Sequence, residues 1–178
     1  MQQWCGNRFG KSLVRPGGSN FRLDLERIKH IESTLQEVIR RYRTVQKDLL
    51  STPSVLSRLE GICPVSREQA VRVGAVGMAA RMTGIRRDIR MHHNFHPLCA
   101  DFEPAQEEGG DLLARLKIRF TEADQSYAMI TAGCKKLSGK WFEAVYPQPE
   151  LSGSKLPSDS LLISLAEGWR GEICHLAL

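Results

Sequence analysis

Residues 28–49 read IKHIESTLQEVIRRYRTVQKDL, and apolar side chains recur in this stretch at alternating intervals of three and four residues. They are Ile28, Ile31, Leu35, Val38, Tyr42, Val45 and Leu49. This seven-residue period lines up one apolar stripe along an α-helix. We therefore expect a helix over about residues 24–50, ended by Thr52-Pro53 because the residue before a proline avoids helical geometry.

A second stripe with the same period follows Asp111, which is a good N-cap residue. Its members are Leu113, Leu116, Phe120, Ala123, Tyr127, Ile130, Cys134 and Leu137. We expect a second long helix over about residues 111–137. Two long helices with heptad patterns indicate an antiparallel pair at the centre of a helical bundle, so the expected fold class is mainly α.

Shorter elements complete the expected fold. Ser66 and Gln69 form a plausible capping box for a helix over about residues 67–83. Residues 161–178 read as a small β hairpin near the C-terminus, with its turn at Gly168-Trp169-Arg170-Gly171. We expect residues 1–178 to form a single region. Because the chain stops inside the second apolar run of the hairpin, we also expect it to be an internal piece of a longer protein.

Composition sets broad limits on function. The chain has 178 residues and a formal net charge of +5, which favours acidic partners, nucleic acid or a membrane surface without choosing among them. No apolar run approaches the ~18 residues that a membrane-spanning helix requires. The five cysteines stand singly in the sequence, a pattern typical of reduced thiols in a cytoplasmic protein.

Three local patterns suggest binding sites but have ordinary alternatives. The glycine-rich stretch Gly6 to Ser12 has three residues between its glycines where a phosphate loop needs four. A group of potential zinc ligands lacks a second cluster to complete a site; its members are His92, His93, His96, Cys99 and, less clearly, Asp101. A basic patch on the first long helix is compatible with nucleic acid or with a solvated face; it comprises Arg40, Arg41, Arg43 and Lys47.

The predicted hairpin turn is the best candidate site. It places two carboxylates, Glu167 and Glu172, beside Arg170 on a loop held by two strands. Such a loop can aim a charged group in a fixed direction. The alternative is a charged hairpin turn in which Arg170 forms a structural salt bridge with Glu167 or Glu172.

Short motifs rich in glycine and arginine recur between residues 15 and 178. They are Arg-Pro-Gly-Gly at 15–18, the glycine-arginine stretch at 74–84, Arg-Asp-Ile-Arg at 87–90, the Gly-Asp start of the second long helix at 110–119, and the hairpin turn at 167–175. The motif positions are Arg15, Gly17, Gly18, Gly77, Arg81, Gly84, Asp88, Arg90, Asp111, Gly171 and His175.

In order and spacing, these motifs resemble the large subunit of energy-converting, membrane-bound nickel–iron hydrogenases and the homologous quinone-site subunit of respiratory complex I. The family holds its catalytic metal with two cysteine pairs, one near each end of the subunit, and this chain has neither pair. The resemblance therefore implies the middle portion of such a subunit. It also implies that Arg170 and Glu167 belong to the active-site loop, because the family's matching arginine stands over the metal centre.

The resemblance implies a function for the parent subunit. That subunit would sit peripherally on the cytoplasmic membrane and pass electrons between iron–sulfur clusters of a small partner subunit and either protons or a quinone. A nickel–iron centre or a quinone would belong to the parent complex. For this chain alone we expect no metal, no cofactor, no nucleic acid and no activity, and apolar surfaces that favour homo-oligomers.

At three places the sequence departs from the family pattern, and one of them bears on the nickel–iron site of the parent. Met78 replaces a proline after Gly77, Arg58-Leu59-Glu60-Gly61 replaces an Arg-Thr-x-Gly stretch, and Trp169 replaces the proline before the active-site arginine. A bulky tryptophan argues against an intact nickel–iron site. The alternative function is a helical protein-interaction or nucleic-acid-binding module without a redox role.

Overall fold

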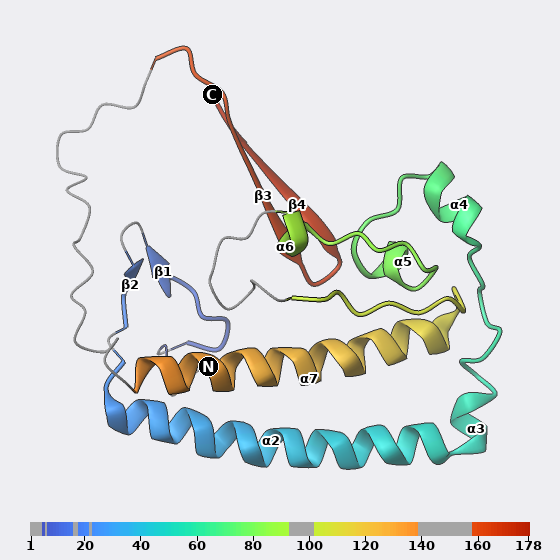
Figure 1. Cartoon of the computed structure of the whole chain (residues 1–178), viewed down its shortest axis with the longest axis horizontal. Helices are drawn as coiled ribbons and strands as arrows, with labels where there is room; N and C mark the ends of the chain where they lie inside the picture. The colour runs from blue at the N-terminus through green and yellow to red at the C-terminus, as the bar shows by residue number, and fades with distance from the viewer. Residues whose placement is uncertain (1–4, 6, 16–17, 22, 93–101, 139–157) are drawn as a thin grey trace. The chain divides into compact units, whose positions relative to one another are not determined.

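The structure is a computed structural model that describes residues 5, 7–15, 18–21, 23–92, 102–138 and 158–178 (Figure 1). Contacts within the chain divide it into two compact units. The first unit comprises Met1–Val38 and Ile130–Ser158, and the second comprises Ile39–Met129 and Asp159–Leu178. That residues 1–178 form a single region stays a prediction.

Both long helices are confirmed. Helix α2 spans Leu25–Ser51 and helix α7 spans Leu112–Leu137. In the second unit they run antiparallel (Figure 1). There the Tyr42 and Phe120 rings meet edge to face at 5.8 Å between centroids, and Arg43 Nη2 lies 2.7 Å from Asp124 Oδ1. The sequence therefore predicts both the helices and their pairing, because a heptad stripe needs an apolar partner.

The predicted stripe on α2 is only partly buried. Val38 and Val45 are 56% and 54% exposed, whereas Ile39, which lies outside the stripe, is 8% exposed. At these two valines the predicted apolar stripe is therefore not part of the core. An α-helix has 3.6 residues per turn, so a strict seven-residue repeat drifts away from one straight partner helix.

The prediction of a single helix over about residues 67–83 is also wrong. Helix α4 spans Arg67–Arg72 and begins with the predicted capping box, in which Ser66 and Gln69 exchange side-chain hydrogen bonds. Gly74, the second residue after the helix, has a φ of +66°. The Gly74 amide bonds to the Val71 carbonyl and the Ala75 amide to the Ala70 carbonyl, which together form a Schellman motif. A separate helix, α5, spans Gly77–Arg81.

The segment before α7 ties α5 to the rest of the second unit. The Glu107 amide donates to the Arg81 carbonyl at 3.0 Å, and the Gly110 amide donates to the Met82 carbonyl at 2.8 Å. These bonds lie beside a small buried core, which consists of Met78, Met82, Ala105, Ala114 and Ile118. Helix α5 is therefore held on two sides, which matters because it carries Arg81.

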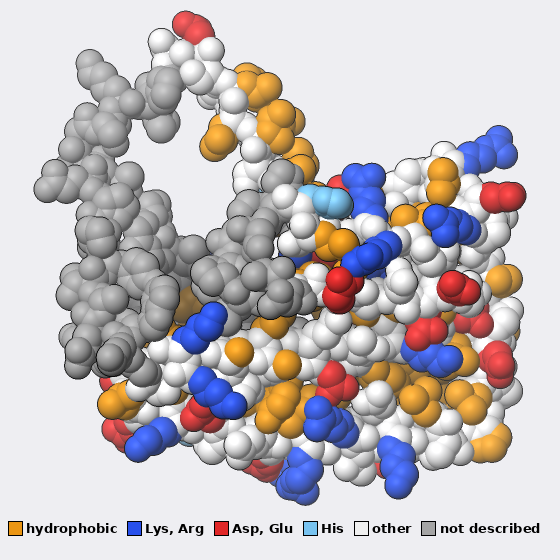
Figure 2. Space-filling model, viewed as in Figure 1, with side chains coloured by type: hydrophobic (Ala, Val, Ile, Leu, Met, Phe, Trp, Pro, Cys, Tyr) orange, Lys and Arg blue, Asp and Glu red, His pale blue; other side chains and the backbone are white. Residues whose placement is uncertain are grey.

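The predicted hairpin near the C-terminus is confirmed. Strand β3, Leu162–Gly168, pairs antiparallel with β4, Gly171–Ala177, and Gly168 faces Gly171 at the turn. Away from its turn, the hairpin leaves Leu162, Ile163 and Leu176 largely exposed. Figure 2 shows hydrophobic side chains at the surface along this part of the hairpin. An exposed apolar surface is thus present, and the expected homo-oligomer stays a prediction.

The remaining elements are short. In the first unit β1, Val14–Arg15, pairs with β2, Gly18–Ser19. Helix α3 spans Pro53–Leu56, and α6 spans Ile89–His92 beside β3. Among the described helices, none is both long enough and apolar enough to cross a lipid bilayer.

Asp111 offers a test of how α7 is anchored. Its Oδ1 accepts from the Ala114 amide and its Oδ2 from the Gly61 amide, both at 2.8 Å. We expect Asp111→Ala to lower the free energy of unfolding by about 1–2 kcal/mol, because it removes both the helix cap and the bond to the preceding loop. Urea denaturation would measure the loss. Asp48→Ala, at an exposed position on α2, is the control. An equal loss in both variants would contradict the anchoring role of Asp111.

Candidate functional site

The hairpin tip and α5 meet backbone to backbone. A Cβ atom built on Gly77 would lie 2.1 Å from the Gly171 Cα, far inside any normal contact. The two glycines have φ values of +60° and +136°, which residues with side chains rarely adopt. Glycine at both positions therefore lets the tip of the hairpin lie directly on the first turn of α5.

Arg81 lies at the centre of a buried ion cluster beside this contact. Its side chain is 2% exposed, and Nη1 lies 3.0 Å from Asp88 Oδ2 and 2.9 Å from Glu167 Oε1. Its Nη2 lies 2.6 Å from Glu122 Oε1. The three carboxylates come from the loop before α6, from β3 and from α7. One guanidinium thus joins three segments that are distant in sequence.

Arg90 completes the cluster on α6. Its Nε and Nη2 donate to the two oxygens of Asp88 at 2.8 and 2.6 Å, a bidentate pair. Burial raises the pKa of Asp88, but the hydrogen bonds from Arg90 and the charges of Arg90 and Arg81 outweigh it and hold the pKa below its usual value. Asp88 is therefore ionised at neutral pH although its side chain is fully buried.

A second ion pair fixes the other strand of the hairpin. Arg87 Nε and Nη2 donate to the two carboxylate oxygens of Glu172 at 2.5 and 3.0 Å. The hydrogen bond from Arg87 lowers the pKa of Glu172. Each glutamate on the hairpin tip thus has its own arginine partner: Arg81, the last residue of α5, for Glu167, and Arg87, between α5 and α6, for Glu172.

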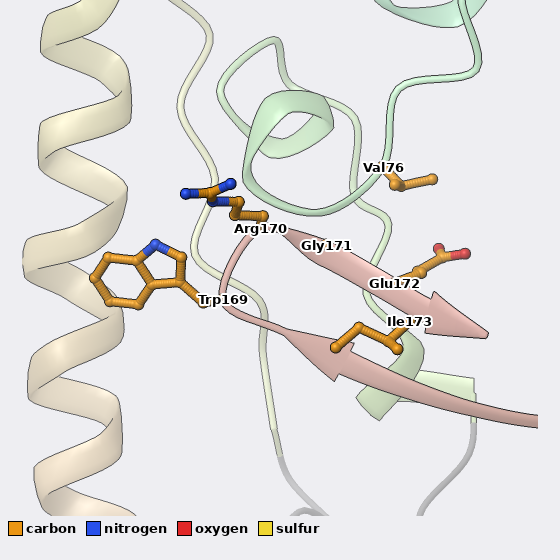
Figure 3. Close-up of a pocket in the computed structure, with 6 residues that line it drawn as sticks. All are labelled: Val76, Trp169, Arg170, Gly171, Glu172 and Ile173. Atoms are coloured by element: carbon orange, nitrogen blue, oxygen red, sulfur yellow. The ribbon is translucent and has the colours of Figure 1, made fainter. Parts of the chain in front are cut away.

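Arg170 stands at the tip itself and is exposed. It lines a hollow of about 400 Å³ together with Val76, Trp169, Glu172 and Ile173 (Figure 3). No hydrogen bond or ion pair joins Arg170 to another described residue, since Arg81 and Arg87 occupy both nearby glutamates. The structural salt bridge that the sequence left open is thus not formed among the described residues, and the guanidinium is available to a ligand.

Trp169 extends from the same turn toward α7 (Figure 3). The guanidinium carbon of Arg119 lies 3.9 Å from the centroid of the Trp169 ring, a cation–π contact. Both tip residues therefore line the smaller hollow, and Trp169 in addition contacts Arg119 of α7.

The structure brings together five of the eleven predicted motif residues, with Glu167, and leaves the others apart. Gly77, Arg81, Asp88, Arg90, Glu167 and Gly171 all meet at the cluster or at the backbone contact. Gly84 follows α5 with a φ of +76°, and His175 is exposed on β4. Arg15 and Gly18 pair in the first unit, and Gly17 lies outside the described residues.

For the predicted zinc ligands and the basic patch, the described residues give little support to a binding site. His92 ends α6, whereas His93, His96, Cys99 and Asp101 lie outside the described residues. Arg43 of the basic patch is engaged by Asp124. Glu122 was missed by sequence reasoning, because a single carboxylate on an amphipathic helix usually faces solvent.

A family model and several known proteins match this chain. A family model described as respiratory-chain NADH dehydrogenase, 49 Kd subunit, matches residues 1–157. The D subunit of NADH-quinone oxidoreductase from Thermosipho melanesiensis is 31% identical over 134 residues, which cover 74% of this chain and 36% of that protein. The D1 subunit of the same enzyme from Chloroherpeton thalassium is 32% identical over 136 residues, covering 74% and 30%.

A solved structure shares the fold. It is the membrane-bound sulfane sulfur reductase, an archaeal respiratory membrane complex, with a TM-score of 0.78 and 23% sequence identity. The match covers 98% of this chain and 48% of that one. The chain thus spans about a third of the length of the two NADH-quinone oxidoreductase relatives and about half of the matched structure.

Removing Arg81 should destabilise the second unit strongly. We expect Arg81→Met to lower the free energy of unfolding by about 3–5 kcal/mol, because it leaves buried carboxylates without a counter-charge. Arg86→Met is the matched control, since Arg86 pairs with Glu103 at the surface and should cost at most about 1 kcal/mol. Chemical denaturation of the two variants would measure the difference, and similar losses would refute the central role of Arg81.

The same cluster predicts a pH dependence. Because the folded-state pKa of Asp88 is lowered, its ionised form stabilises the fold above its unfolded value of about 3.9, and this contribution is lost as the pH falls through the folded pKa. We expect the free energy of unfolding to decline below about pH 4, and to decline less steeply in Asp88→Asn. Unfolding measured from neutral to acid pH would show this; parallel curves for Asp88→Asn and the surface control Asp48→Asn would contradict it.

Proposed function

Since this chain belongs to the family of the 49 kDa subunit of respiratory-chain NADH dehydrogenase, we propose that it forms part of the large subunit of a redox complex that reduces a quinone. Relatives named as D subunits of NADH-quinone oxidoreductase support this proposal. The electrons would arrive from iron–sulfur clusters in a neighbouring small subunit. The complex would be bound to the membrane, with this chain peripheral to it on the cytoplasmic side.

One observation carries the proposal. The motif segments around Arg81, Asp88, Arg90 and Glu167 converge on one buried cluster, and this cluster fixes the hairpin tip that presents Arg170. A cluster of this kind is a costly way to hold a hairpin, because buried ion pairs contribute little net stability. It is well suited to aiming one charged side chain in a fixed direction.

Arg170 would act on the electron acceptor. Reduction of a quinone carbonyl places negative charge on its oxygen before protons arrive. A guanidinium offers a permanent charge and a planar fork of donors, so it can stabilise that oxygen without exchanging a proton itself. Arg170 lacks a partner among the described residues and lines an open hollow, so its donors are not occupied by the protein. Glu167 would be a positioning residue, because its carboxylate is bound to Arg81.

The residues around Arg170 do not fit a nickel–iron centre. Such a centre needs several thiolates close together, and none of the residues lining the hollow of Arg170 is a cysteine. Among the described cysteines, Cys63 and Cys174 are exposed, and Cys5 and Cys134 are buried in the first unit. The relatives named as NADH-quinone oxidoreductase subunits favour a quinone as the acceptor.

Substitution of Arg170 in the assembled complex tests the proposal. We expect Arg170→Lys to lower kcat for quinone reduction about 10-fold or more, because lysine keeps the charge but loses the planar fork. The melting temperature should not change, since Arg170 is exposed and unpaired among the described residues. Membranes or purified complex carrying the variant would be assayed with a soluble quinone, beside the exposed control Arg72→Lys on α4.

Two outcomes would count against it. Unchanged turnover in Arg170→Lys, or a loss that unfolding fully explains, would remove the role of Arg170. A complex that contains this chain but reduces no quinone in any variant would refute the function as a whole.

A further inference from the structure

A second and larger hollow lies in the second unit between α2, α7 and the hairpin tip. Its volume is about 650 Å³, within the range of about 300–1,000 Å³ that is usual for small-molecule sites. Its apolar walls are formed by Tyr42, Val45, Leu49, Leu116, Phe120 and Ala123. Part of this wall is the exposed edge of the α2 stripe, where Val45 has no cover. The hollow is therefore mostly apolar, as ligand sites are.

The charged residues along this hollow are all in ion pairs within the described part of the chain, except Arg119. Glu122 Oε1 is bound to Arg81 at 2.6 Å, Glu167 Oε1 is bound to Arg81 at 2.9 Å, and Arg90 is bound to Asp88. No ion pair joins Arg119 to any other described residue. The wall thus combines a satisfied acidic cluster with one cation that the described part of the chain leaves unpaired, and this cation favours a negatively charged ligand.

Trp169 fixes the direction of that cation. Its ring stacks on the Arg119 guanidinium at 3.9 Å and is itself 75% exposed. Stacking holds the guanidinium plane while leaving the N–H groups at its edge available for a bidentate bond to an oxyanion. The indole is held in place in turn by the contact between Gly77 and Gly171 at the base of the hairpin tip. An indole beside an apolar wall offers a flat surface for a flat ligand.

We propose that this pocket binds a planar aromatic anion, meaning an aromatic carboxylate or sulfonate. Its ring system would lie against the apolar wall of α2 and α7, and its anionic group would accept hydrogen bonds from Arg119. The proposal is independent of quinone reduction, because it uses a different hollow, a different arginine and a charged ligand. Trp169 separates the two, since it lines both hollows while Arg170 lines only the smaller one.

Binding of two matched dyes to the full chain tests the proposal. Anilinonaphthalene sulfonate carries the anion, and its neutral parent phenylnaphthylamine lacks it. In calorimetry and fluorescence titrations we expect one sulfonate dye per chain, bound about 10-fold or more tightly than the neutral dye, as a hydrogen bond to a charged group implies. Equal affinities for the two dyes, or many dyes per chain, would indicate an unspecific apolar surface and overturn the proposal.

Substitutions locate the site. Arg119→Gln should weaken sulfonate binding about 10-fold and leave the neutral dye unchanged. Arg115→Gln, one turn earlier on α7 and exposed, is the control and should change neither. Ala123→Phe should block both dyes by filling the pocket, with folding checked by circular dichroism.

Two further results would defeat the proposal. The first is equal weakening in Arg115→Gln and Arg119→Gln, which would mean that only the net charge matters. The second is a dimer in light scattering whose formation excludes both dyes, which would make this face an interface between copies of the chain.

Discussion

The arrangement of the second unit depends on the burial of one guanidinium. Arg81 can be buried only if its charge is balanced, because an isolated ion in a protein interior is very costly. Its Nη1 and Nη2 groups have carboxylate partners, whereas its Nε has no hydrogen-bond partner among the described residues. The balance comes from Asp88, Glu122 and Glu167, three carboxylates on three different segments. Each segment is thereby held at a fixed distance from α5. Arg90 offsets part of the surplus negative charge from the side of α6.

The position of the hairpin follows from this cluster. A two-stranded ribbon is at best marginally stable by itself, and most of β3 and β4 beyond the tip is exposed. The tip is held in place because three contacts act on it: Glu167 with Arg81, Glu172 with Arg87, and Gly171 with Gly77. The charges set its orientation, and the glycine contact sets how closely it approaches α5.

The sequence predicts what is local and periodic. The heptads indicated α2 and α7 because neighbours three and four residues apart determine a helix face, and Ser66 with Gln69 indicated the start of α4 for the same reason. The prediction of a single helix over residues 67–83 was wrong because the sequence does not give backbone angles. Periodicity alone cannot distinguish a glycine inside a helix from Gly74, whose positive φ ends α4 in a Schellman motif. The resemblance to a family supplied Arg81, Asp88 and Glu167 as separate motif positions, without the contacts among them.

The contacts among these residues cannot be predicted from their spacing in the sequence. Arg81 and Glu167 are 86 residues apart, and Arg81 and Glu122 are 41 apart. No periodicity connects such distances, so nothing in the sequence distinguishes Glu122 from the solvent-facing carboxylates of any amphipathic helix. What could be inferred is a requirement: a buried arginine on a small apolar helix must find carboxylates somewhere.

The pairing of the carboxylates also bears on the two hollows that the hairpin tip lines. Because Glu167 and Glu172 are bound by Arg81 and Arg87, the turn between them contributes no unpaired carboxylate to either side. Trp169 and Arg170 can then extend from the turn without a competing salt bridge there. The Trp169 indole lies against the Arg119 guanidinium instead and forms part of the hollow over α7. The ion cluster that holds the tip does not depend on this contact, since none of its ion pairs involves the Trp169 side chain.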